Sequence, residues 1–157
     1  IAFLSHQTPW RIGAGNNPEQ LPDVPGGASC IAINNRGSIW CVIQSLASPA
    51  ADARARRVIN KDKHLMRFNA TERKWEHHGH APFKVAHVAV GFDPEHKEDI
   101  VCAVTEDGAL LRHVGHHDMR YCCHQPQLRW QRLAHRSVKQ CAVSEDGRLV
   151  LGLADKK

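Results

Sequence analysis

Histidine and cysteine are the residues of this chain with the clearest capacity for chemistry, because both can bind a transition metal. The 157 residues include 12 His and 6 Cys. One polar stretch places His116, His117, Cys122 and His124 close together in the sequence. A zinc ion needs about four N or S ligands in a tetrahedron, and this stretch lacks the spacings of zinc-finger sites. We therefore favour exposed His and incidental Cys over a metal site, and we expect no cofactor.

Carboxylates are the next candidates, because two of them in a cleft can act as acid and base. Acidic pairs recur directly before glycine, in Glu106-Asp107-Gly108 and in Glu145-Asp146-Gly147. Asp-Gly between alternating apolar runs is typical of a hairpin turn, since both residues tolerate positive φ. Recurrence at matching turn positions favours a structural role over catalysis. The chain also has no nucleophile-elbow, phosphate-loop or metalloprotease motif, so we predict that it is not an enzyme.

Tryptophan offers binding chemistry instead, because its flat apolar ring can stack on a sugar ring. Trp10, Trp75 and Trp130 each begin a comparable piece of sequence. We name these three residues and Arg112 as candidate ligand-binding residues. The alternative, which we favour, is that the three rings pack between neighbouring sheets. The fourth tryptophan, Trp40, breaks the repeat and is predicted to lie in the core.

Positive charge is the remaining feature that could select a partner, and the formal net charge is +5. The 21 Lys and Arg are spread along the chain among 16 Asp and Glu. The densest basic stretch falls in a predicted loop and is typical of a solvated loop; it contains Arg54, Arg56, Arg57, Lys61 and Lys63. No apolar run approaches the roughly 20 residues of a membrane-spanning helix. We therefore expect neither a membrane nor a nucleic acid as partner.

Short strands are the elements that must position these residues. Each of Trp10, Trp75 and Trp130 leads into an alternating apolar strand, a polar turn and a further strand. The strands expected in this way are 28–33, 38–43 and 64–69, then 85–90, 100–104 and 109–114, and finally 138–143 and 148–151. Short strands with Gly turns and no helical periodicity predict an all-β meander. We divide this single domain into units of four strands, 10–69, 75–114 and 130–153.

The last unit is incomplete in the sequence. It stops after its third strand, at Leu153. Residues 1–6 have the pattern of the missing outer strand, and a short turn joins them to Trp10 as in the other units. We therefore predict that residues 1–6 complete the unit that begins at residue 130.

The repeat resembles the tectonin family of β-propellers. The resemblance rests on Trp75 and Trp130, on residues 138–143 running into Ser-Glu-Asp-Gly, and on the strand after Glu106-Asp107-Gly108. Residues 65–75 are also similar to the kelch segment that closes one blade and opens the next. The resemblance implies one propeller-type domain over residues 1–157. Propellers carry about 4–8 blades, so either this is a piece of a longer propeller, or two copies join into a six-blade ring in which residues 1–6 of one copy complete the other.

Two functions stay open. The first is a non-enzymatic module that binds a protein partner through the loops 46–63 and 115–129, the second of which contains Tyr121. The other, implied by the tectonin resemblance, is a lectin that binds glycans at repeated sites between blades. Four Cys in apolar strands predict a reducing compartment, which favours the cytoplasm and the first function. The sequon Asn69-Ala70-Thr71 has meaning only in a secreted chain, so secretion stays open.

Overall fold

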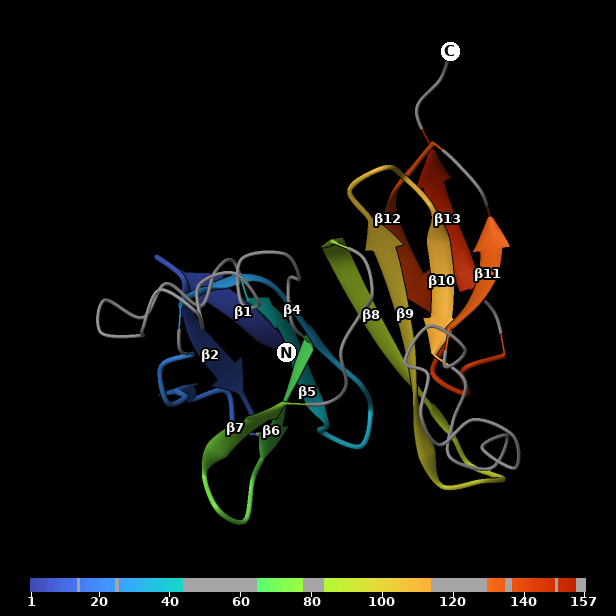
Figure 1. Ribbon diagram of the computed structural model, residues 1–157. Coiled ribbons are helices and arrows are strands. Elements are labelled where there is room, and N and C mark those ends of the chain that lie inside the picture. Colours follow the sequence, from blue (N-terminus) through green and yellow to red (C-terminus); the bar gives the residue numbers. More distant parts are fainter. Residues whose placement is uncertain are drawn as a thin grey trace.

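The computed structural model describes residues 1–13, 15–24, 26–43, 65–77, 84–113, 130–134, 137–148 and 150–154. These residues form thirteen strands in four antiparallel sheets and no helix (Figure 1). The prediction of an all-β fold is therefore confirmed. Within this part of the chain, nothing has the length and apolar character of a membrane-spanning helix.

The four sheets follow one another along the chain, and we number them I to IV. Sheet I contains β1 (Ala2–Ser5), β2 (Thr8–Ile12) and β3 (Pro18–Gln20). Sheet II contains β4 (Ala28–Ile33), β5 (Ile39–Ile43), β6 (Leu65–Asn69) and β7 (Lys74–His77). Sheet III contains β8 (Val85–Asp93), β9 (Glu98–Thr105), β10 (Leu110–His113) and β11 (Trp130–Ala134). Sheet IV contains β12 (Val138–Val143) and β13 (Val150–Ala154).

Sheets II, III and IV are repeats of one structure. The first two strands of each form an antiparallel pair, and the register of each pair shifts directly after its first residue, at Ala28, Val85 and Val138. A β-bulge at the same place in three sheets marks a repeated unit, because a bulge fixes register and local twist. Position by position, the three strand pairs can therefore be compared.

The sheets stack face to face, with β4 packed against β8 and β8 against β12 (Figure 1). Trp40, Val42 and Leu65 of sheet II are buried against the valines of sheet III. The opposite face of sheet III packs on Val138 and Cys141 of sheet IV. Successive strand residues point to opposite faces, so these central strands are apolar on both sides. The prediction that Trp40 lies in the core is confirmed.

Sheet I covers the remaining face of sheet II. Ala2 and Leu4 of β1 point toward that face, where they join the buried Leu21 and Val24. Fully burying a Val or Leu side chain is worth about 1.5–3 kcal/mol. The segment after β3 therefore contributes to this interface although it forms no strand.

One buried carboxylate links sheets II and III. Asp99, only 7 % exposed, accepts hydrogen bonds from Asn34 Nδ2 at 2.8 Å and from Trp40 Nε1 at 3.0 Å. Its second oxygen also lies 3.2 Å from Nε of Arg67. All three partners belong to the hairpin turn and strands of sheet II. A buried charge with every oxygen satisfied fixes the position of one sheet on the next.

Two details of the predicted units are corrected by the strand pairing. The strands that carry Trp75 and Trp130 pair with β6 and β10, so each closes the preceding sheet and does not open the next. The expected units 10–69, 75–114 and 130–153 therefore begin one strand early. Residues 1–6 also do not complete the last sheet of their own chain, because among the described strands β1 pairs with β2 alone and β13 with β12 alone.

Candidate functional site

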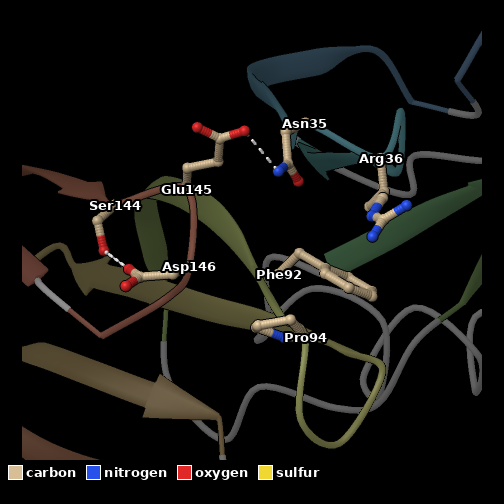
Figure 2. Close-up of a pocket in the computed structure, with 7 residues that line it drawn as sticks. All are labelled: Asn35, Arg36, Phe92, Pro94, Ser144, Glu145 and Asp146. Carbon is tan, nitrogen blue, oxygen red and sulfur yellow. Dashed lines mark hydrogen bonds between the residues drawn. The ribbon is translucent and has the colours of Figure 1, made fainter.

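The turns that follow the first strands of sheets II, III and IV surround a pocket of about 410 Å³ (Figure 2). Each sheet contributes to the lining. Asn35 and Arg36 come from the β4–β5 turn, Phe92 and Pro94 from the end of β8 and the turn after it, and Ser144, Glu145 and Asp146 from the β12–β13 turn. The pocket therefore forms where the equivalent turns of three repeated sheets meet.

Short polar side chains fold these turns. Oδ1 of Asn34 accepts hydrogen bonds from the backbone N–H groups of Arg36 and Ser38, both at 3.0 Å. Asp146 does the same for the backbone N–H of Arg148 at 3.1 Å, and the Ser144 hydroxyl donates to it at 2.6 Å. Asx turns of this kind hold a hairpin loop in one conformation. The predicted turn at Glu145-Asp146-Gly147 is thus confirmed.

The three turns are also bonded to one another. Nδ2 of Asn35 donates to Oε1 of Glu145 at 2.8 Å, which joins sheets II and IV (Figure 2). The backbone N–H of Phe92 donates to the carbonyl of Glu145 at 3.3 Å, which joins sheets III and IV. Gly91 permits this approach, because a Cβ at that position would lie 2.8 Å from the carbonyl oxygen of Ser144. The wall of the pocket is therefore a connected frame and not three independent loops.

The charges around the pocket are mixed. Glu145 and Asp146 supply two carboxylates on one side, and the guanidinium of Arg36 lies 5.0 Å from the centre of the Phe92 ring on the other (Figure 2). The Ser144 hydroxyl, followed by the backbone N–H of Arg148, lowers the pKa of Asp146, so this group stays ionised at neutral pH. An aromatic ring beside two carboxylates suits a ligand with an apolar stem and a positive end.

The seven lining residues include no His, Cys or Lys. The Ser144 hydroxyl donates to Asp146, a carboxylate whose low pKa makes it a weak base. The Ser144 hydroxyl is therefore held within its own turn by Asp146.

The tryptophans named from the sequence lie elsewhere. Trp75 packs on the sheet I–sheet II core, tilts against the Phe68 ring at 5.2 Å and donates its Nε1–H to the carbonyl of Pro22 at 2.7 Å. Trp130 packs beside the sheet II–sheet III core and meets the His113 ring edge-on at 5.1 Å. These contacts are those expected of packing residues.

Trp10 and Arg112 differ from those two. Trp10 stacks on Phe3 at 6.5 Å, on the face of sheet I that points away from sheet II. Arg112 is half-buried on β10 between Cys102 and Gln131, at the position that Arg67 occupies in sheet II. Neither lines the pocket.

The other residues named from the sequence lie outside the described residues. They are the loop residues Arg54, Arg56, Arg57, Lys61, Lys63 and Tyr121 and the metal candidates His116, His117, Cys122 and His124. Among the residues that the structure does describe, no group of three or more His, Cys, Asp or Glu is placed to hold a metal ion.

Cys41, Cys102 and Cys141 are buried in the core as the sequence predicted, and Cys30 and His87 are partly buried. Burial raises the pKa of Cys41 and Cys141 to about 12 and that of Cys102 to about 11, and it also raises the pKa of Cys30. These groups remain thiols and not thiolates at neutral pH. Nδ1 of His87 accepts a hydrogen bond from the backbone N–H of Cys141 at 3.5 Å, so this imidazole links sheets III and IV.

Sequence reasoning missed the pocket because it treated the turns only as turns. The two acidic pairs also occupy different turns, contrary to the expectation that they match. Glu106 and Asp107 lie between β9 and β10, whereas Glu145 and Asp146 lie between β12 and β13. Aligning the turns by the strand that precedes each one would have brought Asn35, Pro94 and Glu145 together.

The comparisons with known proteins add no relative. No family model matches the chain, and no curated protein matches it.

Proposed function

We propose that this protein is a non-enzymatic binding module on a β-propeller scaffold, with sheets II, III and IV as successive blades of the tectonin type. Two observations support the scaffold. The first strand pairs share one register and one bulge position, and the sheets stack with first strand on first strand. In a propeller the matching turns of all blades gather at one end, and function is carried by such loops and not by the fold.

The pocket between the three turns is the observation that carries the function. We infer that it binds a protein partner by accepting a Lys or Arg side chain. The aliphatic stem would lie along Phe92 and Pro94, and the positive end would approach Glu145 and Asp146. The hydrogen bonds between the turns support this assignment, because a preformed pocket loses little conformational entropy on binding.

A lectin is the second candidate, and the pocket supports it less well. Sugar rings bind by stacking on an exposed aromatic face. The rings of Trp75 and Trp130 take part in packing, and Phe92 is the single aromatic residue of the pocket lining. A polar lining with one amide and two carboxylates still leaves hydrogen-bonding groups for hydroxyls, so the experiment must include glycans.

The test compares two variants with the same local sequence. Peptides that contain Lys or Arg are screened on an array, and the best binder is measured by fluorescence polarisation. Glu145→Lys reverses a pocket charge and is expected to weaken binding at least about tenfold, the factor that corresponds to 1.4 kcal/mol. Glu106→Lys makes the same change in the other Glu-Asp-Gly turn, away from the pocket, and is expected to leave the affinity unchanged.

A glycan array on the same protein decides between the two candidates. Peptide binding that is lost in Glu145→Lys and kept in Glu106→Lys supports the protein-binding module. Glycan binding that simple sugars compete away, together with no peptide binding, overturns it in favour of the lectin. Equal losses in both variants also contradict the proposal, since they would place binding outside the pocket.

A further inference from the structure

The hairpin β1–β2 has the same cross-strand pair as the outer hairpins of sheets II and III. In sheet II Phe68 lies opposite Trp75, and in sheet III His113 lies opposite Trp130. In sheet I Phe3 lies opposite Trp10. All three pairs bring an aromatic ring against a tryptophan. By register and by ring contact, β1–β2 is therefore the third outer hairpin of the molecule.

Among the described strands, sheet IV is the sheet without an outer hairpin. Its two strands correspond to the inner pairs β4–β5 and β8–β9. In sheets II and III the second strand pairs on its far side with β6 or β10. Among the described strands, the far edges of β13 and β1 have no strand beside them. Exposed edges of this kind add a further strand readily.

Two exposed leucines on β13 stand at positions that are buried in the other sheets. Leu151 is opposite Ala142, as Trp40 is opposite Ala32 and Cys102 opposite Ala89. Leu151 and Leu153 are 59 % and 62 % exposed, whereas Trp40 and Cys102 are 3 % and 0 % exposed. In sheets II and III this face is covered by the next sheet. The sequence of β13 is therefore that of a covered strand.

The face of β1 agrees with this assignment. Leu65 of β6 and Leu110 of β10 point toward the sheet that follows their own. Ala2 and Leu4 likewise point toward the sheet that follows β1, which is sheet II. A strand added to the free edge of β1 with Leu151 beside Ala2 would turn both exposed leucines toward sheet II of that copy.

We propose that two copies of this chain pair at these edges, with β13 of one copy antiparallel to β1 of the other and Leu151 opposite Ala2. This register is the one that places Trp40 opposite Arg67 and Cys102 opposite Arg112. Each copy then adds β1 and β2, with β3 beyond them, to the two strands of its partner's sheet IV. Three blades from each copy give six, a number within the usual range for a closed propeller. The pairing shares the propeller scaffold with the proposed function but does not depend on the pocket.

Closing such a ring requires one movement within each copy. Within one chain β1 packs on β4, as β4 packs on β8 and β8 packs on β12. It therefore occupies the place that the first strand of a preceding sheet would occupy. In the pair β12 of the partner takes that place, and the hairpin β1–β2 moves outward to the third and fourth positions of the sheet.

The mass of the protein in solution is the first test, measured by light scattering. The full chain is expected to have the mass of two chains. Leu151→Lys combined with Leu153→Lys is expected to have the mass of one, because two charges would enter the covered face. Leu133→Lys is the matched control, since Leu133 is an exposed leucine of β11 outside the proposed contact, and it should remain a pair.

Crosslinking tests the register without relying on the lysine variants. In a chain with Cys122→Ser and Cys123→Ser, one copy carries Ala2→Cys and the other Leu151→Cys. Mixing the two under mild oxidation is expected to give a covalent two-chain product. Leu4→Cys mixed with Leu153→Cys should give little, because the proposed register separates these positions by several residues along the strands.

A one-chain mass for the full protein overturns the proposal. So does a larger assembly that survives both lysines or that crosslinks as efficiently through the off-register pair. Peptide binding to the double-lysine variant separates this result from the pocket, because the pocket lies at the turns of one copy. A monomer that still binds peptide would leave the proposed function standing and remove the pairing.

Discussion

Asp99 shows how one side chain decides the geometry of the molecule. It joins two sheets through Trp40, Asn34 and Arg67, and the hairpin turn that Asn34 folds also carries two residues of the pocket. The carboxylate therefore connects core packing to the candidate site. Its position on a strand gave no sequence signal, because a lone Asp at a strand start is common and its partners are 32 to 65 positions away.

Replacing Asp99 by Ala should destabilise the fold by about 2 kcal/mol. The change removes the buried acceptor that Asn34 Nδ2 and Trp40 Nε1 share between sheets II and III, whereas Arg67 is partly exposed and can be solvated. Urea unfolding followed by tryptophan fluorescence measures the free energy of unfolding. Glu19→Gln is the control, since Glu19 also meets two arginines, Arg11 and Arg73, but in an exposed position. Equal losses in the two variants would contradict the role given to Asp99.

His87 should make stability depend on pH. Burial lowers its pKa below the ordinary 6.5, because the neutral ring is favoured at the interface of sheets III and IV. The unfolded chain therefore binds this proton at a higher pH than the folded chain does. The contribution of His87 is fully present above pH 6.5 and is lost as the pH falls below that value.

Urea unfolding at a series of pH values measures this effect. His87→Gln should flatten the fall in stability below the ordinary histidine pKa. His96 acts in the opposite sense, because the hydrogen bond that its ring donates to Asp93 raises its pKa, and its contribution is lost as the pH rises. The parent chain and the His87→Gln variant should therefore both carry His96→Gln, so that His96 does not contribute to the difference between them. A slope unchanged by His87→Gln would contradict the assigned burial.

At the scale of the elements, the strands were largely predictable and their grouping was not. Alternating apolar residues identified the inner and middle strands of all three repeats, because each has one or two buried faces. Trp75 was assigned to the start of a unit, yet its strand closes the preceding sheet. Periodicity reports that a strand is buried but does not state which neighbour it pairs with. The pocket was hidden for the same reason, since it joins turns of three sheets.

Gly147 tests the turn that holds the acidic side of the pocket. Its φ is +71°, and a Cβ at this position would overlap the Cδ1 atom of Ile100. Gly147→Ala should therefore lower the free energy of unfolding by about 1–3 kcal/mol from backbone strain, with a further loss from the overlap. Gly37→Ala is the control for strain alone, because Gly37 has φ +83° and open space around it.

Thermal unfolding of the two glycine variants measures the difference. The Gly147 variant should melt below the Gly37 variant, and it should also bind peptide more weakly because its turn carries Glu145. The same melting temperature for both variants would show that the close contact between sheets III and IV at this turn does not contribute to the stability of the fold.

At the scale of the whole molecule, the repeat has two consequences. Stacking three copies of one unit brings equivalent turns together, and this makes a pocket that no single sheet contains. Among the described strands, stacking also leaves an open edge at β1 and at β13, and these are the edges that the proposed pairing joins. The pocket needs one copy of the chain, and the proposed ring needs two.

Hydrogen exchange is the measurement that tests the central claim most directly. Amide exchange is followed by mass spectrometry with and without the peptide selected on the array. Slower exchange on binding is expected together in 34–37, 92–97 and 144–147, because the three turns form one site. Unchanged exchange in these turns, with protection elsewhere in the chain, would contradict the account.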